Sequence, residues 1–109
     1  MSDINSTTLA GRLGQDPELK YFDSGAICAE FALAVNEWQG KDKGEKTHWL
    51  PCIVWGKQAE YLSTYGKNGS YIALQGLLQA DSYTAKDGTN RKKVYVKVEN
   101  ISVMNKEQS

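Results

Sequence analysis

Three tryptophans, Trp38, Trp49 and Trp55, are the residues of this chain best suited to binding chemistry, because flat aromatic rings stack on other flat rings. Trp49 and Trp55 are six residues apart in the segment Thr47–Trp55. That separation corresponds to roughly 20 Å if the segment is a β-strand. The spacing would leave room for several stacked or splayed planar groups.

Side-chain alternation divides Thr47–Trp55 into two faces. One face is uniformly apolar and is the natural core side, with Leu50, Cys52 and Val54. The other carries both tryptophans together with Thr47, Pro51 and Ile53. Burial of the tryptophans in a core or a subunit interface remains the alternative, since aromatic side chains are usually buried. Exposure is favoured because the opposite face is already apolar and because Trp38 adjoins a polar loop.

Basic residues accompany these rings. Lys41 lies in the loop that follows Trp38, and Arg91-Lys92-Lys93 follows a predicted hairpin tip at Asp87-Gly88. Exposed rings beside lysine and glycine are typical of surfaces on which bases stack while cations contact phosphates. A run of basic residues is equally common on an ordinary solvated face. Exposure to solvent without any phosphate contact therefore stays open as the alternative for Arg91-Lys92-Lys93.

The cysteines, the histidine and the carboxylates of this sequence do not have the spacing that catalytic or metal-binding motifs require. Cys28 and Cys52 are far apart and form no CxxC pair, which is typical of small buried side chains. His48 is the sole histidine, and Asp16 and Glu18 flank a proline that predicts a turn. No phosphate-binding loop, zinc motif or nucleophile with a His-Asp partnership is found. We therefore predict no catalytic residue, no metal site and no cofactor.

Length and charge set further bounds. The 109 residues suffice for one domain, and 13 basic residues balance 13 acidic ones. The charge is segregated, with seven basic and four acidic residues from Tyr61 onward against two and five in the first 35 residues. A local basic surface is therefore compatible with zero net charge. No leader peptide or membrane-spanning segment is recognised, so we expect a cytoplasmic protein.

Period-two alternation dominates the elements that must position these side chains. The expected strands are Ile4–Leu13, Ala26–Val35, Thr47–Trp55, Ser70–Tyr83 and Arg91–Val103, and the expected helix is Lys57–Tyr65. Five antiparallel strands with a helix between the third and fourth are the arrangement of an OB-fold barrel. We predict this all-β fold with long β-hairpin extensions; a sandwich with an incidental helix is the alternative.

Four segments resemble, in order, the motifs of bacterial single-stranded DNA-binding proteins. They are Gly11–Tyr21, Thr47–Trp49 with Val54–Lys57, Lys67–Ser70, and Asp87–Arg91. The likeness extends over about Ile4 to Ile101. It implies an OB-fold domain over residues 1–104 that assembles as a homotetramer, with a dimer as the alternative. It also implies wrapping of single-stranded DNA in replication, recombination and repair, with association to the nucleoid.

The resemblance also assigns functional residues. Stacking aromatics carry over onto Trp38, Trp49, Trp55 and Tyr83. Phosphate contacts carry over onto Lys20, Lys57, Lys67 and Arg91, with Lys41 in the loop and Lys92 in the basic run as further candidates.

Departures from the family pattern keep a second function open. Gln79–Ser82 stands where the family is often basic, and the loop over residues 36–46 is slightly short. The chain ends in a short polar stretch, residues 105–109, without the family's linker and acidic tail, through which other replication proteins are recruited. A truncated form or a tail-less phage, plasmid or accessory type would both fit. The alternatives are a primosomal-type assembly subunit with weak nucleic-acid binding and, less favoured, a cold-shock-like RNA-binding domain.

Overall fold

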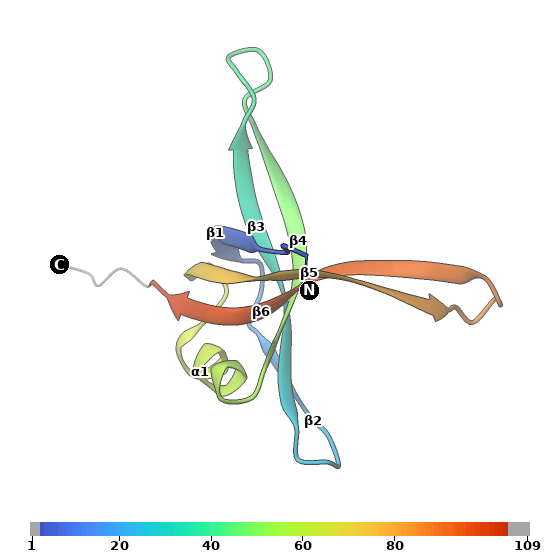
Figure 1. Ribbon diagram of the computed structural model, residues 1–109. Coiled ribbons are helices and arrows are strands. Elements are labelled where there is room, and N and C mark those ends of the chain that lie inside the picture. The colour runs from blue at the N-terminus through green and yellow to red at the C-terminus, as the bar shows by residue number, and fades with distance from the viewer. Residues whose placement is uncertain (1–2, 105–109) are drawn as a thin grey trace.

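Alternating apolar residues give a chain made mostly of strands, as the computed structural model of residues 3–104 shows (Figure 1). The elements, in chain order, are β1 (Thr7–Leu13), β2 (Glu18–Tyr21), β3 (Ile27–Trp38), β4 (Glu45–Trp55), α1 (Lys57–Tyr65), β5 (Tyr71–Thr84) and β6 (Asn90–Val103). The predicted helix has the expected bounds, and the long predicted strands differ at their ends by a few residues. Residues 105–109, on which the expectation of a missing tail depends, lie outside the described residues.

The strands close into the predicted barrel. Their order is β1-β5-β6-β4-β3-β2, and a further pairing of β1 with β3 at Arg12↔Ala34 and Leu13↔Leu33 completes a five-stranded ring. A Cβ on Gly11 would overlap the Ala34 carbonyl oxygen, so glycine permits this close approach. The OB-fold prediction is confirmed.

The expectation that all five strands are antiparallel is wrong. β4 and β6 pair in parallel at Cys52↔Val96 and Ile53↔Lys97. A ring with an odd number of strands cannot alternate direction throughout, so one neighbouring pair must run the same way. The parallel contact is short because the two strands then diverge into separate hairpins.

A short strand, β2, was not predicted. Asp16 and Pro17 indicated a turn, yet pairing with β3 resumes immediately afterwards, from Glu18↔Glu30 to Tyr21↔Ile27. The 12 residues of β3 are long enough to pair with β1 at one end and with β2 at the other. The bend over residues 14–17 thus connects β1 and β2, which both pair with β3.

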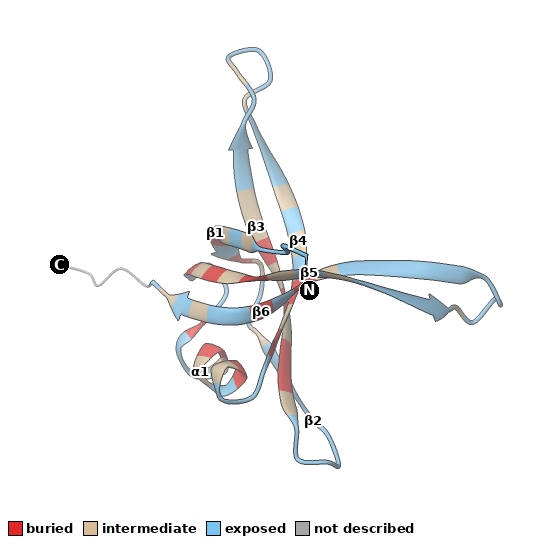
Figure 2. Cartoon of the chain, in the orientation of Figure 1, coloured by how far each residue is buried: buried red, intermediate tan, exposed pale blue. Residues whose placement is uncertain are grey.

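The core lies inside the barrel, where the predicted apolar faces of β3 and β4 meet β5, β6 and α1 (Figure 2). Ala59 and Leu62 of the helix are fully buried and cover one end of the barrel. Tyr65, predicted on the same side of the helix, is instead 57% exposed. The helix ends at this residue, so its ring lies beyond the core and packs at 5.2 Å against the ring of Tyr61.

Side chains of α1 bind the backbone of β6 where that strand has left β4. The Gln58 amide donates to the Glu99 carbonyl at 2.7 Å and accepts from the Ile101 N–H at 3.1 Å. The Val103 N–H donates to the Tyr61 hydroxyl at 2.9 Å. These bonds satisfy backbone N–H and C=O groups of β6 that no longer face β4. They fix the helix against the barrel.

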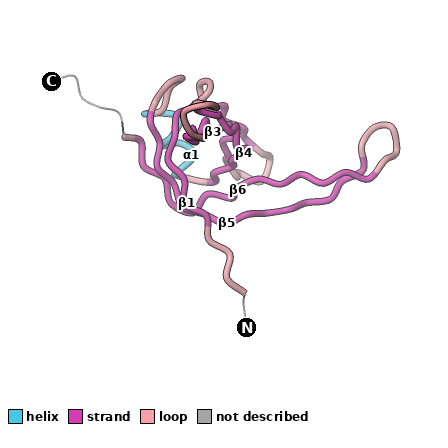
Figure 3. Tube along the Cα trace, turned by 90° about the horizontal axis from the view of Figure 1, so that it is seen from above, coloured by secondary structure: helices cyan, strands magenta, loops and turns pink. Residues whose placement is uncertain are grey.

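Two long hairpins, β3–β4 and β5–β6, extend from the barrel in different directions (Figures 1 and 3). The predicted hairpin tip at Asp87-Gly88 is confirmed: the Ala85 N–H donates to the Thr89 carbonyl at 2.8 Å, and Gly88 has a φ of 87°. Within residues 3–104, no helix has the length and apolar character needed to cross a membrane.

Candidate nucleic-acid interface

The three tryptophans lie on the outer face of the β3–β4 pair and are exposed to solvent. Their exposed fractions are 65% for Trp38, 59% for Trp49 and 43% for Trp55. The register pairs Trp49 with Ala34 and Trp38 with Glu45, so alternation keeps all three on one side of the sheet. The expectation of exposure is confirmed, and the inner residues Cys52 and Val54 are buried.

Gly14 supports the ring of Trp49. A Cβ built on Gly14 would come within 2.5 Å of Cζ3 of that indole. The ring therefore lies against the bend over residues 14–17, and only a residue without a side chain allows this contact. The bend thus holds the indole in place while more than half of its surface stays open.

Phe22 supports the ring of Trp55. The two rings are stacked, with centroids 5.6 Å apart and planes at 28°. Phe22 is itself 45% exposed and follows β2 directly. Phe22 was not predicted from the sequence, where its only signal is an aromatic side chain directly before the turn Asp23–Gly25.

A second group of candidate residues lies on the β5–β6 hairpin. Tyr83 is 50% exposed and stands opposite Arg91, so the two side chains share one face. Arg91 makes an ion pair with Asp87 at 3.3 Å. Lys92 pairs in register with Ser82 and therefore lies on the other face of the hairpin. The structure thus brings together Tyr83 and Arg91 but separates Lys92 from them.

Hydrogen bonds order the tip of this hairpin. The Thr89 hydroxyl and the Thr89 N–H donate to Oδ1 of Asp87 at 2.6 and 3.0 Å. These bonds, the hydroxyl first, and the Arg91 guanidinium hold the pKa of Asp87 below its usual value.

The two aromatic regions belong to one continuous outer surface. The parallel pair Ile53↔Lys97 places Lys97 of β6 on the same face as the tryptophans of β4. From Lys97, alternation along β6 continues on that face to Arg91, opposite Tyr83. Exposed rings and cations therefore follow one path from the β3–β4 pair onto the β5–β6 hairpin.

The remaining predicted cations surround this surface. Lys20 binds Glu30 at 3.1 Å, and this hydrogen bond raises the pKa of the lysine. Lys41 is exposed in the loop between β3 and β4, and Lys57 is exposed at the start of α1. Lys67 is exposed in the loop after α1. The register gives no face for the last three, because they lie outside the strands.

One hydrogen bond and one strand register relate these cations to the edge of the tryptophan surface. The Asn68 N–H donates to Oδ1 of Asp16 at 2.7 Å, which ties the loop of Lys67 to the bend below Trp49. Lys20 lies in register with Cys28, which in turn lies opposite Trp55. Lys20 and Lys67 are thus positioned at the margin of the tryptophan surface.

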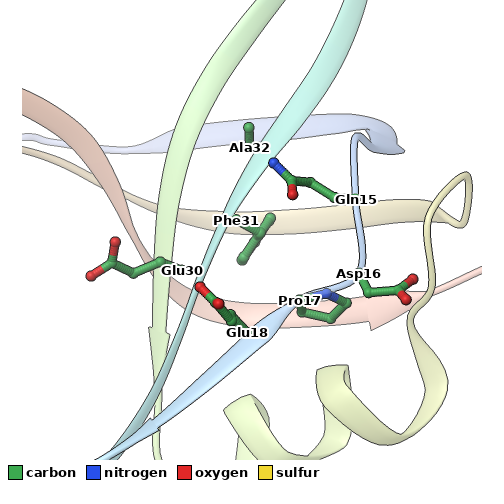
Figure 4. A pocket seen from close by; sticks show the side chains of 7 residues that line it. All are labelled: Gln15, Asp16, Pro17, Glu18, Glu30, Phe31 and Ala32. Atoms are coloured by element: carbon green, nitrogen blue, oxygen red, sulfur yellow. The ribbon is translucent and has the colours of Figure 1, made fainter.

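An acidic hollow of about 360 Å³ lies beside the same surface (Figure 4). Its lining includes Asp16, Glu18 and Glu30, and Figure 4 shows the Asp16 carboxylate pointing away from the other two. Glu30 is already bound by Lys20. Among residues 3–104, no group of three or more His, Cys, Asp or Glu side chains could hold a metal ion.

The two thiols are buried, and the histidine is paired with a carboxylate. Burial raises the pKa of the Cys52 thiol to about 12, which keeps it protonated at neutral pH. Cys28 is 2% exposed. His48 Nε2 lies 2.8 Å from the Glu37 carboxylate on the neighbouring strand, and this hydrogen bond lowers the pKa of Glu37. The contact between His48 and Glu37 joins β4 to β3.

Comparison with known proteins gives a consistent result. Residues 4–104 match the family described as the single-strand binding protein family. A Synechocystis protein named single-stranded DNA-binding protein 1 is 42% identical over 102 residues, which cover 93% of this chain and 84% of the relative. Single-stranded DNA-binding protein 2 of Clostridium acetobutylicum is 39% identical over 93% of this chain and 77% of its own length. A Nostoc protein named single-stranded DNA-binding protein 1 is 36% identical, covering 96% and 87%.

Proposed function

This chain belongs to the single-strand binding protein family, and on that basis we propose that it binds single-stranded DNA without sequence preference. The observation that carries the proposal is the exposure of Trp38, Trp49 and Trp55 on one face of the barrel. Every base has a flat face, so stacking on these rings does not depend on base identity. The activity is binding and requires no catalytic residue.

Affinity comes from stacking and from phosphate contacts together. The stacking residues are Trp38, Trp49, Trp55 and Tyr83, and the phosphate-contacting residues are Lys20, Lys41, Lys57, Lys67 and Arg91. Lys92 lies on the other face of its hairpin and serves as a comparison for Arg91. Because phosphate neutralisation releases counterions, binding weakens as the salt concentration rises.

The functional unit in this proposal is a homotetramer, with a dimer as the alternative. Thr7–Gly11 of β1 pairs with β5 on one side, and its other edge has no paired strand among residues 3–104. Such an edge can accept a strand from a second copy. Light scattering coupled to size exclusion tests this, and a monomer at micromolar concentration would exclude wrapping around an oligomer.

In the cell, the proposed role is protection of single-stranded DNA in replication, recombination and repair, in the nucleoid region of the cytoplasm. The support is the family membership and the exposed aromatic face. A protein that retains DNA only weakly but copurifies with a replication partner would instead be an assembly subunit.

The deciding experiment is a titration of intrinsic tryptophan fluorescence with oligo-dT at low and high salt. We expect strong quenching at low salt, because the bases stack on the exposed indoles, and weaker binding at high salt. Competition with oligo-U separates DNA from RNA binding. Absence of quenching at low salt would contradict the proposal.

A further inference from the structure

Tyr95 occupies the corner at which the two aromatic regions meet. It lies two residues before Lys97, the last outer-face residue of β6 that is paired with β4. From this point the β5–β6 hairpin diverges from the β3–β4 pair (Figures 1 and 3). Alternation places Tyr95 on the same outer face as Lys97, since Val96 between them is buried.

The stretch of surface around Tyr95 otherwise contains no assigned stacking residue. Lys97 and Arg91, which is level with Tyr83, are six residues apart on β6. This separation is roughly 20 Å along the strand. A DNA strand that follows the outer face from Trp55 to Tyr83 must cross the stretch between Lys97 and Arg91. Tyr95 lies within that stretch.

The ring of Tyr95 is held in a defined position. Its hydroxyl donates to Oδ2 of Asp81 on β5 at 2.9 Å. The Lys93 ammonium lies 5.6 Å from the ring centroid. The hydroxyl bond to Asp81 raises the pKa of Tyr95, so the ring stays uncharged at neutral pH. Tyr95 is half-buried, unlike the exposed tryptophans and Tyr83, so the accessible part of an oriented, neutral ring lies next to a cation.

The same contacts explain why an acidic residue is tolerated there. Asp81 lies in the stretch Gln79–Ser82, where the family resemblance leads one to expect basic residues. Its carboxylate accepts the Tyr95 hydroxyl and stands opposite Lys93 in the register. The hydroxyl donor and the positive charge of Lys93 on the neighbouring strand offset its repulsion of phosphates. Asp81 then positions the aromatic ring instead of contacting the DNA backbone.

We propose that Tyr95 is a further base-stacking residue, positioned by Asp81, which with Lys93 carries single-stranded DNA across the corner between the two hairpins. This inference rests on the proposed function. The base stacks on the phenol ring, and the adjoining phosphates lie near Lys93 and Lys97. The path of the strand is then continuous from the tryptophans to the hairpin tip.

Affinity measurements with matched variants test this role. Tyr95→Leu removes the ring at similar volume, and we expect its affinity for oligo-dT to fall about 5- to 100-fold. Tyr95→Phe keeps the ring but removes the hydroxyl bond to Asp81, so its affinity should lie between those of the unmodified protein and Tyr95→Leu. An unchanged affinity in Tyr95→Phe would refute the positioning role of Asp81. Tyr65→Leu, an exposed tyrosine on the helix, is the control and should bind normally.

The outcomes separate this inference from the proposed function. If Trp55→Ala weakens binding and Tyr95→Leu does not, the role of Tyr95 is refuted while the proposed function stands. If neither changes binding, the stacking roles of both residues are refuted while DNA binding itself stands; the proposed function fails only if the unmodified protein does not bind oligo-dT. Thermal unfolding and light scattering are recorded for each variant, and loss of the oligomer in Tyr95→Leu would assign Tyr95 to a subunit contact and overturn the inference.

Photocross-linking gives a second readout that does not depend on a substitution. Oligonucleotides containing 5-iododeoxyuridine are irradiated in complex with the full chain and digested with trypsin. Cleavage after Lys93 and Lys97 releases residues 94–97, in which Tyr95 is the only aromatic residue. We expect a cross-link in this peptide. Cross-links confined to the peptides of the tryptophans and Tyr83 would contradict the proposal.

Discussion

The two long hairpins both present aromatic side chains, yet they hold them by different means. On the β3–β4 pair, Trp49 rests on Gly14 and Trp55 stacks on Phe22. Both supporting residues belong to other parts of the barrel. These two rings are therefore fixed by packing before any ligand binds.

On the β5–β6 hairpin, support comes from polar contacts within the hairpin itself. Tyr83 lies in the stretch Ala80–Thr84, in which every residue is exposed. The tip is ordered by Asp87, Thr89 and Arg91. Exposed hydrogen bonds and ion pairs stabilise weakly compared with packing. The aromatic surface on the barrel is therefore held by packing, and the one on the β5–β6 hairpin is held by exposed polar contacts.

The largest expected effect follows directly from this difference. Trp55→Ala should cost about 1–3 kcal/mol of oligo-dT binding free energy. Tyr83→Ala should cost less, since ordering an exposed side chain offsets about 0.5–1.5 kcal/mol of what its stacking contributes. Fluorescence and anisotropy titrations measure both. Trp55→Phe, which keeps a ring, is the control, and a larger loss for Tyr83→Ala would contradict the comparison.

The prearrangement of Trp49 depends on Gly14, which gives a second prediction. In Gly14→Ala, the new methyl group displaces the indole, and we expect a loss of about 1 kcal/mol in oligo-dT binding, at the lower end of the cost of losing a stacking ring. The emission of Trp49 should shift at the same time. In a Trp49→Ala background the same substitution should have no further effect on binding. Equal effects in both backgrounds would show that Gly14 does not act through Trp49.

Most of the fold was predictable because the alternation of apolar residues is strong. The inner faces of β3 and β4 and the bounds of α1 agree with the prediction. The parallel pair was missed because closure of a five-stranded ring is a property of the whole topology and leaves no local signal. β2 was missed because Asp16 and Pro17 indicate a turn, although pairing with β3 resumes one residue later.

The candidate site was predictable only where alternation or resemblance identified a residue. The exposure of Trp49 and Trp55 follows from the apolar opposite face, and the structure confirms it. Phe22 and Tyr95 were missed because their roles depend on neighbours distant in the sequence. Arg91 and Lys92 were grouped as one basic run, although adjacent strand residues point to opposite faces. Whether any of these residues contacts DNA stays a prediction.

The opposite orientation of Arg91 and Lys92 gives a third prediction, smaller than the loss of a ring. For single strands, each neutralised phosphate contributes about 0.7 to the slope of log affinity against log salt. Because that slope is negative, Arg91→Ala should make it shallower by about 0.7, and Lys92→Ala should leave it unchanged. Titrations at several salt concentrations measure both slopes. Equal changes would show that DNA contacts both faces of the β5–β6 hairpin, which is then not a simple extension of the outer surface.

The smallest expected effect concerns the tip of the β5–β6 hairpin at acid pH. Folding lowers the pKa of Asp87 from its usual 3.8, chiefly through the Thr89 hydroxyl. The stabilisation by this carboxylate is therefore fully present above pH 3.8 and is lost as the pH falls through the lower folded-state pKa. The Thr89 amide, which donates to Asp87 at 3.0 Å, should shift in NMR spectra over this acid range.

Asp87→Asn is the matched control for this titration, because it cannot lose a proton and should show no such shift. The pH at which the tip amides shift, relative to the pH at which core amides shift, then tests the comparison between the hairpins. If the tip is held only by its own polar contacts, its amides change before those of the buried strand residues Leu33 and Val54. If the tip and these core amides change together at one pH, the β5–β6 hairpin is coupled to the barrel, and Tyr83 is as firmly prearranged as the tryptophans.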